Sequence, residues 1–234
     1  MIHLIIGKGE IGTALGRLIE NSGQFVYYHD PVKHLEGGHA DVTHICIPYS
    51  DNFVSDVNTL ISRFSPDLTI IHSTVQIGTT SRCGDNVAYS FARGRHPTLD
   101  NMVRETKHVG GVNPQVVEKA VDILKTIGFK TMAHDNPEVV ELGKLLDTSY
   151  YGICLAFNKY SHSIAEDLGV NFEDIKQMNH TYNEGAKAEG WPQFVRPEID
   201  YMPGPIGGHC VVPNARILGK KYPHKLLESI EEAK

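Results

Sequence analysis

The segment IHLIIGKGEIG, residues 2–12, decides the fold of the first part of this chain. Its first five residues are mostly apolar, and they lead directly into Gly7, Gly9 and Gly12 with the spacing GxGxxG. This order predicts a strand, a tight glycine turn and the start of a helix. The helix continues as an apolar stripe with spacings of i, i+3, i+4, i+7 and i+8, formed by Ile11, Ala14, Leu15, Leu18 and Ile19.

A second predicted strand, QFVYYHD, ends at Asp30, 18 residues after Gly12. In a dinucleotide-binding turn, the first glycine makes the turn, the second lets a pyrophosphate approach the backbone, and the third allows close helix packing. Amides at the helix N-terminus bind the anion, and the acid that ends the second strand accepts the ribose hydroxyls. We therefore expect NAD as cofactor, held by Gly7, Gly9, Glu10, Ile11, Gly12 and Asp30.

Strands and helices continue to alternate along the chain. Further strands are predicted at 44–48, 69–75, 87–90, 107–112 and 129–133, with one amphipathic helix carrying Phe53 to Phe64 and another carrying Val116 to Leu124. This alternation predicts an α/β domain at 1–136, with a Rossmann-type, mostly parallel sheet covered on both faces. Ligands bind beyond the carboxyl ends of such strands, so cofactor contacts are also expected at Pro48, Ser73 and Thr74.

Strand patterns stop at Pro137, and an all-helical second domain is predicted at 137–234. Residues 138–168 form one continuous helical pattern, which is far longer than a typical helix. Such a helix either crosses a large domain or packs against a copy of itself. We infer a homodimer that is formed through this helix.

Two side chains in the second half could carry chemistry. Lys144 lies on the long helix, where a desolvated ammonium requires a partner or a substrate anion, although a surface lysine fits the spacing equally well. Cys210 follows Gly207 and Gly208 at a predicted junction between loop and helix, where helix amides can activate a thiol. The alternative role for a cysteine, a small buried apolar side chain, suits Cys46 and Cys154 better.

Composition excludes several classes of function. The 234 residues carry a net charge of −6 without a basic run, so nucleic acid is not an expected partner. No stretch reaches the roughly 18 apolar residues of a membrane span, and the N-terminus lacks a signal-peptide pattern, so a cytoplasmic protein is expected. The four cysteines are widely spaced and expected to be reduced, and the thirteen histidines contain no HxH or HxxxH pair that would indicate a metal site.

Five segments together resemble the UDP-glucose/GDP-mannose dehydrogenase family, in the order that the family has them: GKGEIG, CIPYS, HSTVQIGTT, ELGKLLDTSYYG and PGPIGGHCVVP. The resemblance implies oxidation of a sugar primary alcohol to a carboxylate with two NAD. It implies that Cys210 attacks the intermediate aldehyde, that Lys144 stabilises the oxyanion and that Thr74 lies beside cofactor and substrate. The substrate would be a small molecule such as a sugar nucleotide, contacted by Arg93, Thr148, Gly207 and Gly208.

Three positions depart from the family pattern. Ala92 stands where a glutamate is expected, Thr148 where an asparagine is expected, and Asn214 where an aspartate is expected among the catalytic residues. The family continues into a second α/β domain that supplies much of the nucleotide-sugar site, so the chain resembles a short form. A smaller substrate, or a separate partner that completes the site, is expected.

Two other functions remain open. In a β-hydroxyacid dehydrogenase-like enzyme, Lys144 would serve acid and base chemistry and Cys210 would be incidental. In a non-catalytic NAD-binding sensor or subunit, the missing carboxylates would matter little. Lys33, near the expected ribose site, would favour NADP if it were not simply a solvated loop charge.

Overall fold

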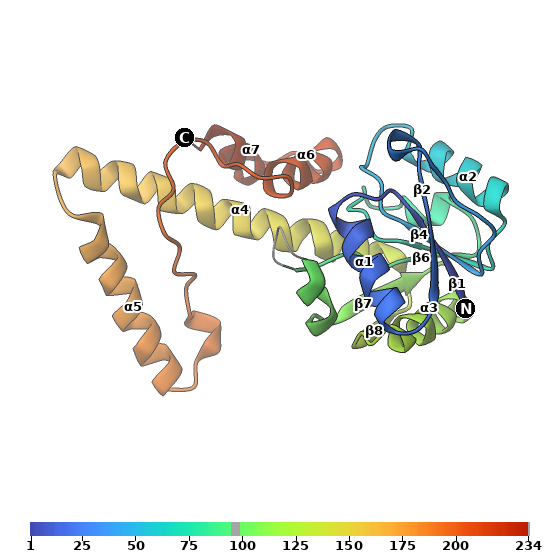
Figure 1. Cartoon of the computed structure of the whole chain (residues 1–234). Coiled ribbons are helices and arrows are strands. Elements are labelled where there is room, and N and C mark those ends of the chain that lie inside the picture. Colours follow the sequence, from blue (N-terminus) through green and yellow to red (C-terminus); the bar gives the residue numbers. More distant parts are fainter. Residues whose placement is uncertain (95–98, 234) are drawn as a thin grey trace. The chain divides into compact units, whose positions relative to one another are not determined.

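The computed structural model describes residues 1–94 and 99–233. Its central feature is an eight-stranded sheet with the order β3-β2-β1-β4-β5-β6-β7-β8. Figure 1 labels most of these strands and the α-helices. The β2–β3 and β6–β7 pairs are antiparallel, and the other neighbouring strands run parallel. The strands are β1 Ile2–Ile6, β2 Phe25–Asp30, β3 Leu35–Glu36, β4 Val42–Ile45, β5 Leu68–Ile71, β6 Val87–Tyr89, β7 Lys107–Gly111 and β8 Thr131–His134.

Side chains on the two faces of this sheet enter two separate apolar cores, because successive residues of a strand point to opposite faces. Ile5 packs in the core that α1 and α3 cover, whereas Leu4 and Ile6 pack in the core that α2 and the start of α4 cover. The α-helices are α1 Glu10–Asn21, α2 Phe53–Phe64, α3 Pro114–Thr126, α4 Pro137–Leu168, α5 Phe172–Ala188, α6 Val211–Lys221 and α7 Lys225–Glu232. The short 3-10 helices are η1 Pro31–Lys33, η2 Thr80–Arg82, η3 Leu99–Arg104 and η4 Pro192–Phe194.

The predicted fold class, a Rossmann-type sheet followed by a helical region built on one long helix, is confirmed. The strand predicted at 129–133 is Thr131–His134, and two other predicted strands extend too far. The strand predicted at 44–48 is Val42–Ile45, which leaves Cys46 just beyond it, and the strand predicted at 69–75 ends at Ile71. The run HSTV continues the strand-like composition after the backbone has left the sheet. The two-residue β3 and the antiparallel direction of β7 were not predicted.

The chain forms two compact units, Met1–Lys144 and Leu145–Lys234. The boundary between them falls within α4, which is one continuous helix of 32 residues. Among the described residues, no helix has the length and apolar composition that crossing a membrane requires.

Candidate functional site

The glycine turn after β1 has the geometry that its sequence predicts. Gly7 has φ +93°, and a Cβ placed there would meet the Cys46 carbonyl oxygen at 2.8 Å. A Cβ on Gly12 would lie 2.0 Å from the Gly7 carbonyl oxygen, so α1 could not pack this closely with any larger residue. At Gly9, in contrast, no described atom lies within 4 Å of an added Cβ. The backbone at Gly9, which precedes the first residue of α1, is therefore open to a ligand.

Asp30 fixes the glycine turn to the end of β2. Its Oδ2 accepts a 2.8 Å hydrogen bond from the Lys8 backbone nitrogen, and its Oδ1 accepts from the backbone nitrogens of Val32 and Lys33. The bond from Lys8, followed by those from Lys33 and Val32, holds the pKa of the Asp30 carboxyl below its usual range, and burial opposes this effect. Asp30 is thus an ionised carboxylate beside the open backbone of the turn, where one further acceptor site can receive a ribose hydroxyl.

Lys33 contributes to the same turn. Its Nζ donates to the Lys8 carbonyl oxygen, so Lys8 is bonded by Asp30 through its backbone nitrogen and by Lys33 through its carbonyl oxygen. This contact gives Lys33 a structural role that the sequence did not indicate.

The loops after β4 and β5 meet through Ser73. Its hydroxyl donates a 2.6 Å hydrogen bond to the Ile47 carbonyl oxygen, which places the residue before Pro48 next to the β5 loop. Ser73 is buried, Thr74 is half-buried and Pro48 is exposed. Among these predicted cofactor contacts, the Ser73 hydroxyl is already engaged in holding the loops together, and Thr74 and Pro48 offer accessible surface at the carboxyl edge of the sheet.

Glu141 on α4 is a buried residue that the sequence analysis missed. Its Oε1 accepts from both the backbone nitrogen and the hydroxyl of Thr80, at 2.8 and 2.7 Å, and its Oε2 accepts from the Gly78 backbone nitrogen. Burial raises the pKa of the Glu141 carboxyl, and the bonds from Thr80 and Gly78 oppose this rise. Residues 78–80, the GTT of HSTVQIGTT, are therefore hydrogen-bonded to α4 through the Glu141 carboxylate, three residues before Lys144.

Arg93 and Lys144 are brought together at the Phe91 ring. The Lys144 Nζ lies 5.3 Å from the ring centroid and the Arg93 guanidinium carbon lies 5.6 Å from it, both within the range of cation–π attraction. Phe91 follows β6 closely, so both cations lie at the carboxyl edge of β6. Two half-buried cations therefore lie at this edge, and both are candidates for contact with an anionic group.

In the second unit, Cys210 is the residue that precedes α6, and it is half-buried. Gly207 and Gly208 lie in the exposed loop before it, and Gly208 has φ +89°, a conformation that favours glycine. Asn214, in the first turn of α6, is buried with 4% of its surface exposed, and its Nδ2 has no hydrogen-bond partner among the described residues. Thr148 is likewise buried.

Lys159 holds the loop that leads to Cys210, a role that was not predicted. This buried α4 lysine donates from its Nζ to the carbonyl oxygens of Met202 and Gly204. Its Nζ also lies 5.3 Å from the centroid of the Tyr201 ring. The cation therefore fixes the backbone just before the Gly207–Gly208 pair.

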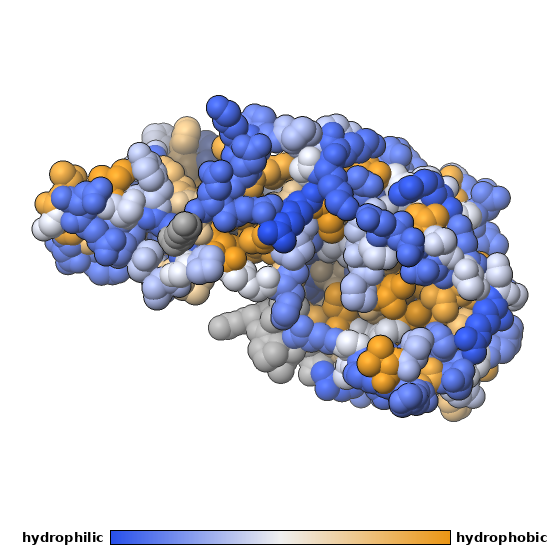
Figure 2. All heavy atoms as spheres, turned by 90° about the horizontal axis from the view of Figure 1, so that it is seen from above, coloured by the Kyte–Doolittle hydropathy of each residue, from blue (hydrophilic) through white to orange (hydrophobic). Residues whose placement is uncertain are grey.

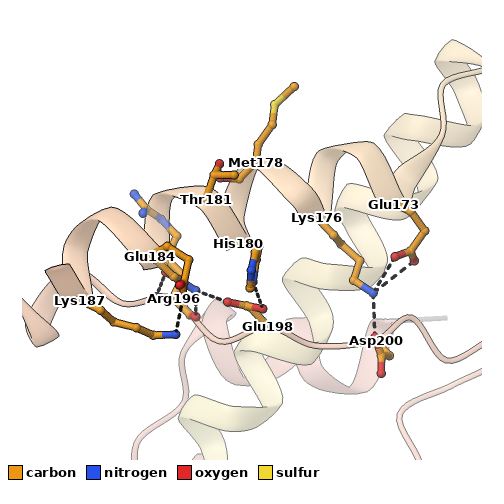
Figure 3. Close-up of polar contacts among 11 residues, drawn as sticks. Glu173, Lys176, Met178, His180, Thr181, Glu184, Lys187, Arg196, Glu198 and Asp200 are labelled. Carbon is orange, nitrogen blue, oxygen red and sulfur yellow. Dashed lines mark hydrogen bonds and ion pairs between the residues drawn. The ribbon is translucent and has the colours of Figure 1, made fainter.

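The segment before this loop is attached to α5 by ion pairs, as Figure 3 shows. Lys176 bridges Glu173 and Asp200, and His180 bonds Glu198. Further contacts come from Asn183, whose amide nitrogen donates to the Glu198 carboxylate and the Arg196 carbonyl oxygen. Asn183 is buried, whereas the carboxylates of these ion pairs are exposed, so the ion pairs position the segment more than they stabilise the fold.

Sequence comparison confirms the resemblance to nucleotide-sugar dehydrogenases. The chain is 23% identical over 219 residues to UDP-N-acetyl-D-mannosamine dehydrogenase of Methanocaldococcus jannaschii, covering 82% of this chain and 46% of that relative. It is also 23% identical over 154 residues to the enzyme of the same name from Methanococcus vannielii, covering 62% of this chain and 33% of the relative. The chain thus spans less than half the length of these curated relatives. No model of a protein family matches it.

Solved structures share the fold over the whole chain. UDP-D-ManNAc dehydrogenase from Pyrococcus horikoshii superposes with a TM-score of 0.77 at 16% identity, covering 100% of this chain and 68% of that one. The 3-hydroxyisobutyrate dehydrogenase of Mycobacterium tuberculosis gives a TM-score of 0.72 at 13% identity, covering 99% of this chain and 91% of that one. The sheet followed by a long helix is therefore shared by dehydrogenases of two different lengths.

Proposed function

We propose that this chain binds NAD and oxidises a hydroxyl group of a small molecule, with a sugar nucleotide as the favoured substrate class. The observation that carries the proposal is the open backbone at Gly9 beside the fixed Asp30 carboxylate. These residues fit the pyrophosphate and the adenine-side ribose of a dinucleotide, and the Asp30 charge disfavours a 2'-phosphate. The curated relatives, all named UDP-N-acetyl-D-mannosamine dehydrogenases, support the substrate class.

Within this proposal, NAD supplies a hydride acceptor when it is bound. The chain supplies the charge that the reaction requires, because loss of the hydroxyl proton places negative charge on the substrate oxygen before the hydride leaves. Lys144 is the residue that stabilises this oxygen, and Arg93 holds an anionic part of the substrate near the same Phe91 ring. Thr74 and Pro48 line the edge at which cofactor and substrate meet.

Cys210 is the proposed nucleophile for an aldehyde. The thiolate would add to the aldehyde carbon to form a thiohemiacetal, and loss of a hydride to a second NAD would convert it to a thioester. Water would then break the carbon–sulfur bond, which releases the carboxylate and regenerates the thiol. Its support within the second unit is its position at the start of α6, after an exposed glycine loop that Lys159 holds. Gly207 and Gly208 allow a substrate to approach the backbone there.

The departures from the family favour a second candidate, a single oxidation that uses Lys144 without a covalent step. Ala92 cannot act as a general base, and the buried Asn214 amide cannot take the role of a carboxylate. In this alternative, the reaction stops after one hydride transfer and Cys210 is not required.

Turnover with matched variants separates these functions. NADH formation is measured with a panel of UDP-N-acetylhexosamines, other sugar nucleotides and short hydroxyacids, and the number of NADH formed per substrate is counted. Cys210→Ser is compared with Cys154→Ser on α4. Two NADH per sugar nucleotide, lost only in Cys210→Ser, is the expected result. One NADH with full Cys210→Ser activity supports the alternative, and NAD binding without any turnover overturns both enzymatic roles.

The exposed apolar residues of α4 support a homodimer. Leu146, Tyr150, Phe157 and Ile164 are each at least 40% exposed, and the spacing from Tyr150 to Phe157 to Ile164 repeats every seven residues. Figure 2 shows apolar residues at the surface of the part formed by α4 and α5, at the left of the view. A second copy of the helix is the proposed cover, and sedimentation of Tyr150→Glu against Tyr182→Glu on α5 tests it. Tyr150→Glu is expected to yield monomers. Equal masses for the wild type, Tyr150→Glu and Tyr182→Glu would contradict a dimer that is formed through this face of α4.

A further inference from the structure

Three histidines that are far apart in the sequence form one continuous row across the sheet. His3 lies in β1, His44 in β4, and His72 just after β5. In the strand register, His3 lies opposite Val42 and His44 lies opposite Ile70. His44 is thus two residues beyond the partner of His3, and His72 is two residues beyond the partner of His44. Because side chains two residues apart share a face of the sheet, all three histidines point to one face. The His3 Nδ1 lies 2.9 Å from the His44 Nε2, and the His44 Nδ1 lies 2.9 Å from the His72 Nε2.

Polar groups close the row at both ends. At the amino-terminal edge of β1, the His3 Nε2 lies 2.9 Å from the Gln24 Oε1. At the carboxyl edge, the His72 Nδ1 lies 3.2 Å from the Lys107 Nζ and 2.7 Å from the Ser90 carbonyl oxygen. The Lys107 Nζ also donates to the carbonyl oxygens of Ser90 and Phe91, at 3.0 and 2.7 Å. The three imidazoles are at most 1% exposed and Lys107 is 3% exposed.

In one arrangement of protons along the row, a charged lysine donates to the His72 Nδ1, which must then move away from the Ser90 carbonyl oxygen because both atoms are acceptors. The Lys107 ammonium has three N–H groups, which match the three acceptors at Ser90, Phe91 and the His72 Nδ1. His72 must then carry its proton on Nε2 and donate to His44, and His44 must likewise donate to His3. The His3 Nε2 finally donates to the Gln24 Oε1. All three imidazoles are neutral, with the proton on Nε2.

With a neutral lysine the direction of the row is reversed, and the 2.7 Å contact between the His72 Nδ1 and the Ser90 carbonyl oxygen becomes a hydrogen bond. The His72 Nδ1 now carries the proton and donates to the Ser90 carbonyl oxygen, His44 donates from Nδ1 to the His72 Nε2, and His3 donates from Nδ1 to the His44 Nε2. The His3 Nε2 becomes an acceptor. It then requires a donor from water or from a turned Gln24 amide, since the Gln24 Oε1 cannot donate.

We propose that Gln24, His3, His44, His72 and Lys107 form a proton relay through the sheet, which connects Lys107 at the carboxyl edge with solvent beside Gln24 at the opposite edge. In the outward direction, Lys107 gives a proton to the His72 Nδ1 and becomes a neutral amine. His72 passes its Nε2 proton to the His44 Nδ1, and His44 passes its Nε2 proton to the His3 Nδ1. The His3 Nε2 proton leaves to water, so one proton crosses and each imidazole changes its tautomer.

The charges around the row suit transfer near neutral pH. Burial lowers the pKa of Lys107 to about 7, the Cys46 thiol opposes this shift, and Lys144 adds to it. Burial also lowers the pKa of both His44 and His72 well below the usual value, so these rings remain neutral on either side of a transfer. Burial lowers the pKa of His3 as well. Gln24 counteracts this shift, the Met1 amino group adds to it, and Asp41 also counteracts it.

Lys107, the inner end of the relay, is linked through Phe91 to two candidate site residues. Lys107 is the first residue of β7, which runs antiparallel to β6, and its Nζ bonds the carbonyl of the same Phe91 whose ring contacts Arg93 and Lys144. A proton released from a hydroxyl group at this edge would have a route to the opposite edge. The relay itself stands on the hydrogen-bond geometry and does not depend on the proposed dehydrogenase activity.

Nitrogen-15 NMR of protein labelled at histidine and lysine tests the relay directly. Between pH 5.5 and 8.5, the signals of His3, His44 and His72 are expected to change together from the Nε2–H to the Nδ1–H tautomer, with the same midpoint as Lys107. His108 and His134 serve as an internal control, because the His108 Nδ1 also lies 2.9 Å from the His134 Nε2 but neither ring belongs to the row. The signals of these two histidines should not change with the midpoint of Lys107. Fixed tautomers, or three unrelated midpoints, would overturn the proposal.

A substitution at the outer end gives a second test. Gln24→Met removes the acceptor of the charged-lysine arrangement, so the common midpoint is expected to move to lower pH. Gln115→Met, at an exposed position on α3, is the matched control and should leave the midpoint unchanged. An unchanged midpoint in Gln24→Met would mean that Gln24 does not terminate the row, and the proposed path would be wrong.

Discussion

The Glu141 carboxylate accepts two hydrogen bonds from one residue, Thr80, through its backbone nitrogen at 2.8 Å and its hydroxyl at 2.7 Å. These bonds attach α4 to the loop after β5. The loop carries Thr74 and the helix carries Lys144, so one buried carboxylate sets the positions of two candidate site residues.

Substitution of Glu141 by Gln should destabilise the fold. The amide replaces one of the two accepting oxygens with an N–H₂ group, which then faces the backbone N–H of either Gly78 or Thr80, leaves a buried donor without a partner and costs about 1–3 kcal/mol. The free energy of unfolding in urea measures the loss. Glu138→Gln, at an exposed position on the same helix, is the control. Equal stability of Glu141→Gln and the wild type would show that the bonds do not hold the loop.

Asp30 should make stability depend on acid pH. Its pKa is lower in the folded chain than in the unfolded one, chiefly because of the Lys8 backbone bond. Its contribution is therefore present above the unfolded pKa and lost as pH falls through the folded pKa. Asp30→Asn should be destabilising at pH 7 and have little effect at pH 2. Unfolding curves at the two pH values measure this difference, and a loss of equal size at both would contradict the assignment.

The Lys159 ammonium should protect the loop before Cys210 from proteolysis. Lys159→Met removes the donor to the Met202 and Gly204 carbonyl oxygens, so proteases should cleave faster between residues 202 and 208. Lys187→Met, which removes an exposed ion pair on α5, provides the comparison. Cleavage of Lys159→Met at the wild-type rate and sites would mean that the loop is held by other contacts.

Replacement of Lys144 should lower the rate of turnover without changing the affinity for NAD. Removal of one group that stabilises a developing oxyanion typically lowers kcat by about 10²–10³-fold. Lys144→Met is therefore expected to bind NAD like the wild type and to form NADH at that reduced rate. Lys125→Met, on α3, is the matched exposed lysine. A Lys144→Met variant with wild-type kcat would remove Lys144 from the proposed chemistry.

The features that the sequence predicted well are local ones. The strand, glycine turn and helix of residues 2–21 follow from neighbouring residues alone, and so does the long α4, because their hydrophobic periods are regular. The predicted end of β5 was wrong because Ser73 and Thr74 suit a strand, although the loop bonds of Ser73 and Thr80 take the backbone out of the sheet.

Residues that act through distant contacts could not be predicted in this way. The row of His3, His44 and His72 joins positions 41 and 28 residues apart. Glu141 and Gly78 are 63 residues apart, and Lys159 and Gly204 are 45 apart. In a single sequence, a buried histidine or lysine looks like a surface one, and only the strand register and helix packing bring these partners together.

Calorimetric titration with NAD tests the central claim, a dinucleotide site at the Gly7–Gly12 turn, most directly. One NAD per chain is expected, with weaker binding of NADP because of the Asp30 carboxylate and loss of NAD binding in Gly9→Val, whose side chain would fill the open space at the backbone. Gly143→Val, at an exposed glycine with open space on α4, is the control. Absence of NAD binding to the wild type, or equal binding by Gly9→Val, would mean that the turn is not a dinucleotide site.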